Sequence, residues 1–171
     1  FDVVKTVLAQ EGEIGFWTIR MKPGKPLAFG IFAAPDGRVV PHLGLPGNPV
    51  SAMMTFELFG RPAIFKMLGK LQTDPQAWQR PTVRAVALDR IVNSDGRRFY
   101  ARGIAAQATT AEGGAWQVRL SGPQGSGVLT SMSFANGYAI CPEDVAAIEA
   151  GEECDVILVD RETPVPPPRR G

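Results

Sequence analysis

The sequence has few of the residues on which histidine-dependent and metal sites depend. Its 171 residues include one histidine, His42, and two cysteines, Cys141 and Cys154. A histidine-rich metal site is therefore excluded, and any Ser-His-Asp triad would have to use His42. Two thiols are too few for a disulfide scaffold or a four-cysteine zinc site, so we interpret them as buried thiols of a cytoplasmic protein. We expect His42 to be structural, because no histidine, cysteine or acidic partner for it is evident.

An excess of charge of one sign and long apolar runs are also missing. Eighteen basic residues face 17 acidic ones, and the formal net charge of +1 argues against a nucleic-acid partner. No apolar run approaches the ~18 residues that span a bilayer, so we expect no membrane partner. Glycine (19) and proline (15) are abundant, which excludes a helical bundle and favours short strands joined by turns.

The first part of the chain reads as a mixture of helix and strand. Apolar spacing predicts a helix over 2–10 with Asp2 as its N-cap. A second helix is expected to begin at Asn48-Pro49, which suit an N-cap and a first helical position, and Arg61-Pro62 should interrupt or kink it. Strands are expected over 14–21, 27–33 and 39–45.

The second part of the chain reads mostly as strand. Asn93-Ser94-Asp95-Gly96 predicts the turn of a hairpin, and one short helix is expected within 127–136. Strands are expected over 82–91, 97–109, 116–121, 138–141 and 154–159.

These patterns predict an α/β fold followed by a β fold. We expect an α/β segment over 1–69, a polar linker over 70–79, a small β domain over 80–162 and a Pro-rich, disordered tail over 163–171.

One motif that could carry chemistry is the strand-to-helix turn Leu45-Pro46-Gly47-Asn48-Pro49-Val50-Ser51. The first backbone N–H groups of a helix lack intrahelical partners and carry a partial positive charge, so Val50, Ser51 and Ala52 could bind an anion. The alternative is an ordinary capped helix that binds nothing.

A second motif, Lys22-Pro23-Gly24-Lys25-Pro26, places two lysines on one tight turn. Ammonium groups bind oxyanions as point charges, and this turn and the helix start could open onto the same sheet edge. The alternative is a solvated hairpin tip.

A third motif, Ser121-Gly122-Pro123-Gln124-Gly125-Ser126-Gly127, is rich in glycine. It could wrap an anion or a pterin-like ring, or it could be a structural turn. Arg102 on a strand is either a ligand contact or a surface charge.

Together these residues resemble the molybdopterin molybdenumtransferases, the bacterial molybdenum-insertion enzymes that are similar to the C-terminal domain of gephyrin. The resemblance rests on Met21 to Pro26, on Phe29-Gly30 and on Leu45 to Ala52. It continues through 121–126, 131–137 and 149–152, and it covers about residues 1 to 160.

This resemblance implies a fold and an activity. The fold would be part of a three-layer α/β molybdopterin-binding domain followed by a small β-barrel-like domain. The activity would be insertion of molybdate into adenylylated molybdopterin with release of the nucleotide, with Mg²⁺ involved. The implied catalytic residues are Lys22, Lys25 and Asp2, and Asp2 would also hold the metal. The implied cofactor-binding residues are Pro46, Gly47, Asn48, Pro49, Ser51, Arg102, Gly125 and Ser126.

The resemblance also implies partners and shows departures. A homodimer and an interaction with the molybdopterin adenylyltransferase are expected. Thr18 stands where some relatives carry a further lysine, and Arg20 is the candidate replacement. The Gly-Gly-x-Ser-x-Gly motif that should precede Asp2 is absent, and the chain begins at Phe1, so we expect a fragment. The alternative function is a non-catalytic molybdopterin-binding or dimerisation module.

Overall fold

The computed structural model describes residues 6, 10, 13–108 and 114–159. The helix expected over 2–10 lies almost wholly outside the described residues. Asp2 and the expected Pro-rich tail over 163–171 also lie outside them.

A three-stranded antiparallel sheet forms the start of the described chain. Its strands β1 (Glu13–Thr18), β3 (Pro26–Ala33) and β4 (Val39–Gly44) lie in the order β1-β3-β4. They fall close to the expected ranges because aromatic and β-branched residues favour extended backbone, and the Gly- and Pro-containing turns separate them. The first expected strand ends early, and a separate two-residue strand follows it, β2 (Met21–Lys22).

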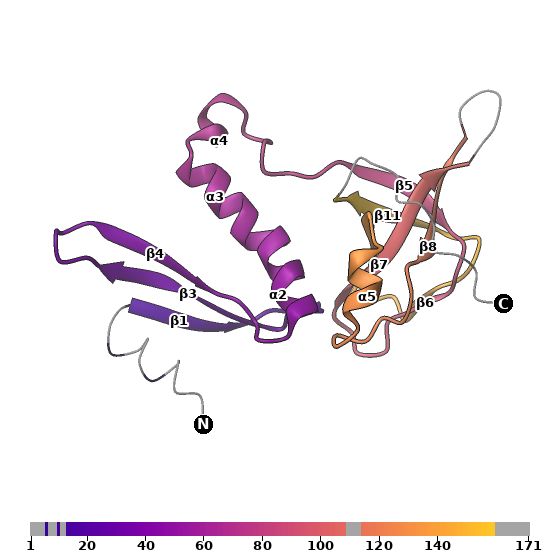
Figure 1. Ribbon diagram of the computed structural model, residues 1–171. Coiled ribbons are helices and arrows are strands. Elements are labelled where there is room, and N and C mark those ends of the chain that lie inside the picture. Colours follow the sequence, from indigo (N-terminus) through magenta and orange to yellow (C-terminus); the bar gives the residue numbers. More distant parts are fainter. Residues whose placement is uncertain (1–5, 7–9, 11–12, 109–113, 160–171) are drawn as a thin grey trace.

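A continuous helical rod runs between the sheet and the second part of the molecule (Figure 1). It consists of α2 (Pro49–Thr55), the π-helical turn η1 (Phe56–Gly60) and α3 (Arg61–Met67), and the short α4 (Lys70–Thr73) follows. The Arg61-Pro62 pair changes the hydrogen bonding rather than ending the helix. Pro62 has no N–H to donate, and the π turn immediately before it carries the longer bond from Arg61 N–H to the Phe56 carbonyl.

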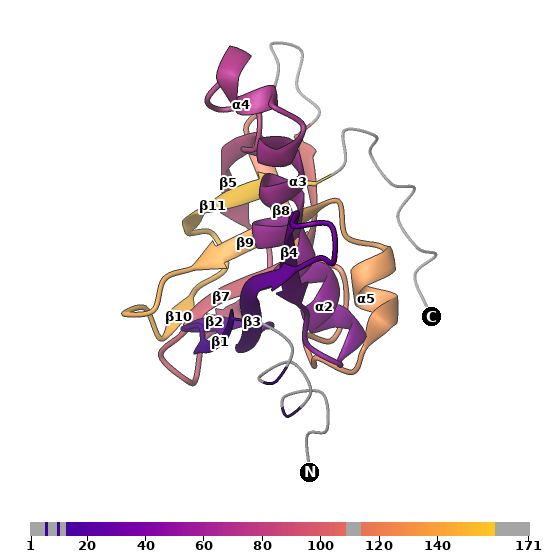
Figure 2. The same ribbon diagram turned by 90° about the vertical axis from the view of Figure 1, so that its left-hand side faces the viewer.

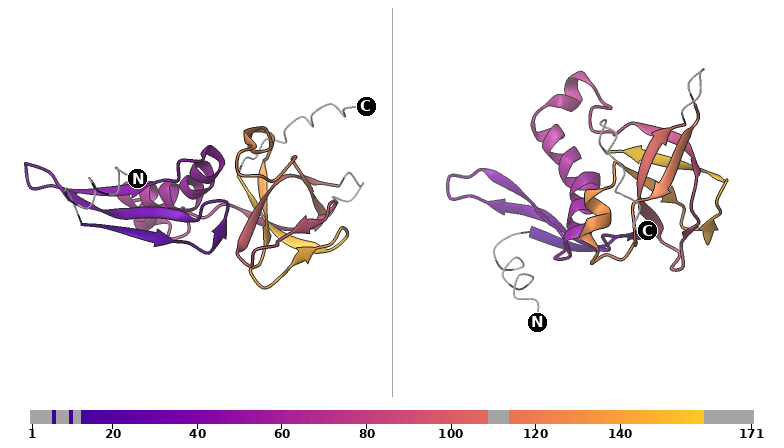
Figure 3. Two further views of the ribbon diagram at one scale, coloured as in Figure 1. Left: turned by 90° about the horizontal axis from the view of Figure 1, so that it is seen from below. Right: turned by 45° about the vertical axis from the view of Figure 1, so that its right-hand side comes forward.

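A closed five-stranded barrel forms the second part, and the ring is visible in the left view of Figure 3. The sheet closes because β9 pairs with both β11 and β7. This confirms the expected barrel-like fold. The barrel strands are β5 (Thr82–Ala87), β7 (Arg98–Gln107), β8 (Trp116–Leu120), β9 (Gly137–Cys141) and β11 (Glu153–Leu158). Short β6 (Ile91–Val92) and β10 (Ala147–Ile148) pair with each other, and α5 (Leu129–Ser133) packs outside.

The hairpin expected around residues 93–96 does not form. β5 pairs with β8 and β11, whereas β7 pairs with β2, β8 and β9. The buried Asn93 helps to close the turn, since its side-chain amide donates to the carbonyls of Arg97 (2.8 Å) and Pro142 (2.9 Å). A side chain that satisfies backbone carbonyls in this way removes the need for a strand partner across the turn.

The two parts of the molecule are joined by strand β2. It pairs in parallel with β7, with Met21 opposite Arg98 and Lys22 opposite Phe99. A strand has two edges, and β9 occupies one edge of β7 over residues 99–103. β2 therefore shares the other edge with β8, which covers residues 103–107. The segment 70–79, which was expected to be a linker and begins with α4, is consequently not the only connection between the two parts (Figure 2).

A largely buried carboxylate also connects the rod to the segment just before the barrel. Glu57 Oε1 accepts from Nε of Arg61 (2.7 Å) and from Nε of Arg80 (2.6 Å). Its second oxygen accepts from Nη2 of Arg80 at 3.2 Å. Because Arg80 comes just before β5, this cluster sets where the barrel begins relative to the rod.

Large apolar side chains on the three-stranded sheet remain exposed. Trp17 is 62% and Phe29 51% exposed, and both line a wide, mostly apolar hollow between the sheet and the rod, with Phe59 and Ala63 opposite. Exposed contiguous apolar surface of this kind is typical of an interface.

We therefore expect the 171-residue chain to self-associate. Replacing Trp17 and Phe29 together by lysine should shift it towards monomer, because charge disfavours burial of this face in an interface. Sedimentation velocity measures the change, and Leu88→Lys on the exposed barrel surface is the matched control. A wild-type chain that sediments as a single monomer across a concentration series would contradict this expectation.

The buried Cys154 thiol in the barrel core should make the stability of the protein depend on pH. Burial raises the pKa of the Cys154 thiol to about 11. The unfolded thiol has a pKa near ~8.5, so between pH ~8.5 and 11 only the unfolded state ionises and stability falls as pH rises. Urea unfolding at fixed pH values should show that the wild type loses about 3 kcal/mol more than Cys154→Ala across this window. Equal losses in both proteins would show that Cys154 does not contribute.

Candidate functional site

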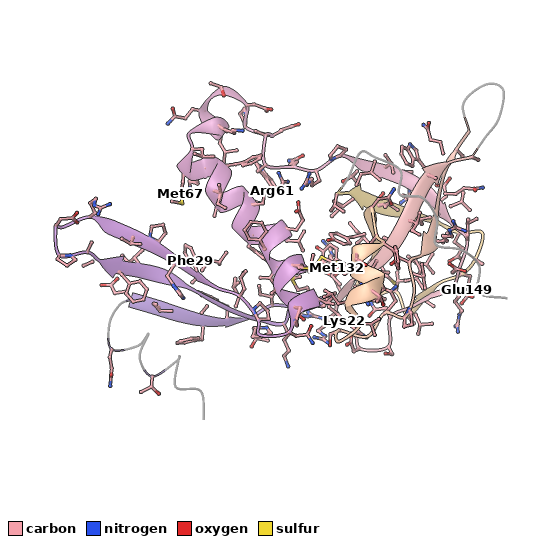
Figure 4. The ribbon with its side chains drawn as sticks, in the orientation of Figure 1. Lys22, Phe29, Arg61, Met67, Met132 and Glu149 are labelled. Atoms are coloured by element: carbon pink, nitrogen blue, oxygen red, sulfur yellow. The ribbon has the colours of Figure 1, made fainter. Side chains whose placement is uncertain are left out.

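A cleft of about 580 Å³ lies where the β2 turn, the start of the rod and the barrel meet. Figure 4 labels Lys22 at this junction, at the foot of the rod. Of the residues singled out in the sequence, the cleft brings together five from three separate motifs: Lys22, Lys25, Ser51, Gly125 and Ser126. The rest of the lining includes Arg90, Arg97, Phe99 and Gln124.

Gly24 explains why the lysine turn reaches the helix. Its φ is +107°, and a Cβ there would lie 2.7 Å from Oγ1 of Thr55 on α2. Only glycine allows this approach without strain or collision. Ser51 is one helical turn before Thr55, so the same face of α2 brings its hydroxyl to the cleft. The Lys22–Pro23 peptide bond in this turn is cis.

The cleft is strongly cationic. Lys22, Lys25, Arg90 and Arg97 line it, and the lining includes no carboxylate. Lys22 Nζ lies 5.2 Å from the centre of the Phe99 ring and 3.6 Å from Asp95 Oδ2, and Asp95 also pairs with Arg97. The hydrogen bond from Arg97, with the charge of Lys22 adding to it, lowers the pKa of Asp95. Four cations around one cavity are suited to a small anionic ligand.

The edge of β7 explains how the glycine-rich loop reaches the cleft. Between β8 and β2 no strand covers Arg102, and the Gln124 side chain takes that place. Its Oε1 accepts from Arg102 N–H (2.8 Å), and its Nε2 donates to the Arg102 carbonyl (3.1 Å). The amide thus imitates a neighbouring strand and holds Gly125 and Ser126 at the cleft.

The Arg102 side chain lies behind this loop and does not line the cleft. It is fully buried, and its Nε donates to Ser131 Oγ (2.9 Å). Nη2 donates to the carbonyls of Pro123 (3.0 Å) and Gly125 (3.1 Å). Burial lowers the pKa of Arg102 from its usual value. The structure therefore gives Arg102 the role of supporting the loop, whereas the resemblance implied contact with the ligand.

The helix start differs from the expected anion site. Asn48 Oδ1 accepts from the N–H groups of Val50 (3.2 Å) and Ser51 (3.5 Å), and the Ala52 N–H donates to the Asn48 carbonyl (2.8 Å). The three donors expected to be free are thus used by the cap. Of the segment 46–51 only Ser51 lines the cleft, so Pro46, Gly47, Asn48 and Pro49 shape the turn beside it.

The remaining candidates lie elsewhere. Arg20 does not replace a cleft lysine, because it lines other hollows and donates to the Gly96 carbonyl at 3.3 Å. His42 packs edge-on against Phe32, with ring centroids 5.4 Å apart, and does not line the cleft. Asp2 lies outside the described residues.

The site residues implied by the sequence did not include the charged, aromatic and amide side chains that complete the cleft lining, Arg90, Arg97, Phe99 and Gln124. Only Gln124 had a signal, since it lies in the glycine-rich motif. The other three belong to no motif: Phe99 lies on β7 opposite Lys22, and Arg90 and Arg97 come just before β6 and β7.

Within residues 13–108 and 114–159, no three histidine, cysteine, aspartate or glutamate side chains gather closely enough to hold a metal ion. No helix in the same ranges has the length and apolar character needed to cross a bilayer.

The support that Arg102 gives to the loop can be tested. Arg102→Met should leave Ser131 Oγ and two carbonyls without their buried donor and cost about 2–4 kcal/mol of unfolding free energy. Arg119→Met, an exposed arginine on neighbouring β8, should change it by less than about 0.5 kcal/mol. Chemical denaturation measures both, and similar values for the two variants would refute the supporting role.

The fold and the cleft together describe an α/β segment joined to a β-barrel, with a junction suited to a small anionic molecule. Two family models match the chain. The model described as a probable molybdopterin binding domain matches residues 1–66, and the model of the MoeA C-terminal region (domain IV) matches residues 84–159.

Relatives and solved structures agree with these matches. The chain is 34% identical over 152 residues to a molybdopterin molybdenumtransferase of Haemophilus influenzae, which covers 88% of this chain and 34% of that protein. It is 30% identical to gephyrin of Dictyostelium discoideum, over 92% of this chain and 23% of that protein. A molybdopterin biosynthesis moeA protein from Pyrococcus horikoshii has a similar structure, with a TM-score of 0.60 and 26% identity over 86% of this chain and 32% of the other.

The chain therefore belongs to the molybdopterin molybdenumtransferase family. It spans about a third of the length of the bacterial relatives that it matches.

Proposed function

We propose that this chain provides part of the site at which molybdate is inserted into adenylylated molybdopterin, with release of the nucleotide. The observation that carries the proposal is the cleft, where Lys22, Lys25, Ser51 and Ser126 converge from separate motifs. Family membership supports it, because molybdopterin molybdenumtransferase is the name of the bacterial relatives.

The chemistry of the cleft suits this reaction. Molybdate and the phosphate groups of the substrate are anions, and the cations would hold them close together and in a fixed orientation. Lys22 is well placed for this, because its side chain is 33% exposed and rests against Phe99. Ser51 and Ser126 would add hydroxyl donors, which can follow the changing positions of oxyanion oxygens. Exchange of oxygen ligands on molybdate needs no activated protein nucleophile.

The described cleft residues do not by themselves fit Mg²⁺. This ion prefers carboxylate oxygens, and Asp95 and Glu149 beside the cleft are each paired with a cation. The proposed Mg²⁺ site therefore depends on Asp2, and no step of the mechanism is derived through it.

The proposed partners are a second copy of the chain, through the exposed apolar sheet, and the molybdopterin adenylyltransferase, which would supply the adenylylated substrate. The proposed location is the cytoplasm.

The catalytic assignment is tested by substitution in the full-length gene product. Lys22→Ala should reduce molybdate insertion about 100-fold, and Ser126→Ala about tenfold, because each removes a group that faces the bound anions. Release of AMP and formation of the molybdenum cofactor are the two measurements.

Lys66→Ala is the control, since Lys66 is an exposed lysine on α3 away from the cleft. Unchanged insertion in both the Lys22 and Ser126 variants would refute the site. A non-catalytic binding module would be favoured instead if the wild type bound the pterin without inserting molybdate and the two variants lost that pterin binding.

A further inference from the structure

Asp95 is an acidic group beside the cationic cleft, and the sequence offered it only as part of the turn 93–96, with no role at the site. It lies on the turn between β6 and β7, and its Oδ2 is 3.6 Å from Lys22 Nζ. The same oxygen pairs with Arg97, whose Nη1 also donates to the Met21 carbonyl at 3.2 Å. One carboxylate therefore contacts two of the four cations that line the cleft.

Lys25 shows how a lysine of the cleft lies when no carboxylate is close to it. Among the described residues it has no ion pair, and its side chain is exposed. Lys22, in contrast, is held between Asp95 and the face of the Phe99 ring. The position of Lys22 and its freedom to meet a ligand thus both depend on Asp95.

We infer that Asp95 is an internal counter-ion of the cleft, which competes with the bound oxyanion for Lys22 and so weakens and selects anion binding. This inference rests on the proposed function. An oxyanion that contacts Lys22 Nζ must lie within a few ångströms of the Asp95 carboxylate, which repels it. When the anion leaves, Asp95 takes Lys22 back, so the cleft favours exchange of its anion over permanent retention.

The repulsion must grow with the charge of the ligand. Coulomb energy is proportional to the product of the charges, so a dianion loses about twice the binding free energy that a monoanion loses. Asp95 should therefore penalise molybdate, a tetrahedral dianion, more than perrhenate, a tetrahedral monoanion of similar shape. A residue that only holds the turn in place would affect both anions alike.

The test is calorimetric titration of the 171-residue chain with molybdate and with perrhenate. Asp95→Asn keeps a hydrogen-bond acceptor for Arg97 but removes the charge. We expect it to bind molybdate about tenfold more tightly and perrhenate about threefold more tightly than the wild type does. Added salt should reduce the difference, since screening weakens a charge effect. Asp95→Ser makes the same charge change if the asparagine variant does not fold.

Two controls separate this inference from the proposed function. Asp36→Asn removes a carboxylate of an exposed Asp36–Arg38 ion pair on the β3–β4 turn and should leave both affinities unchanged. Lys22→Met should abolish molybdate binding, and a variant that binds normally would overturn the proposed site itself. If Lys22→Met loses binding but Asp95→Asn gains no affinity, or gains equally for both anions, only the role of Asp95 is overturned.

Discussion

The parallel pairing of β2 with β7 is the contact on which the rest of the structure depends. It places two residues of the α/β segment, Met21 and Lys22, on the edge of a barrel strand from the second half of the chain. That edge is available because β8 covers only residues 103–107 of β7. The glycine-rich loop docks on the stretch of this β7 edge that lies between β8 and β2. The cleft therefore exists because one strand edge is divided among β8, the loop and β2.

The same junction explains the electrostatics of the cleft. Lysines and arginines that meet in one cavity repel each other, and this cost must be offset in the folded protein. Asp95 and Glu149 provide negative charge beside the cleft rather than within it, so the cavity stays open to an anion. Arg102 has a different role, because it supports the glycine-rich loop from behind with hydrogen bonds to the loop carbonyls. The arginine that supports the loop is thus separate from the lysines and arginines that face the cavity.

Several elements could be predicted from the sequence because their causes are local. Strands β3 and β4 follow from extended-favouring residues bounded by turns, and the cap at Asn48 follows from residue type. That cap takes the donors that an anion would need, which is the outcome that the alternative of an ordinary capped helix described. The turn at 93–96 led to the wrong prediction of a hairpin, for a reason that is not local. Its residues favour reversal, but whether a reversal becomes a hairpin depends on which strands compete for pairing.

The sequence by itself determined most strands and helices, the turn that carries both lysines, the glycine-rich loop, and the family to which the chain belongs. These features depend on residues close together in the chain. The tertiary structure alone decided that Arg90, Arg97 and Phe99 join the cleft, that Arg102 stands behind it and that Asp95 restrains Lys22. Contacts between residues far apart in the chain depend on which strand edges remain open after folding, and no local pattern encodes that outcome.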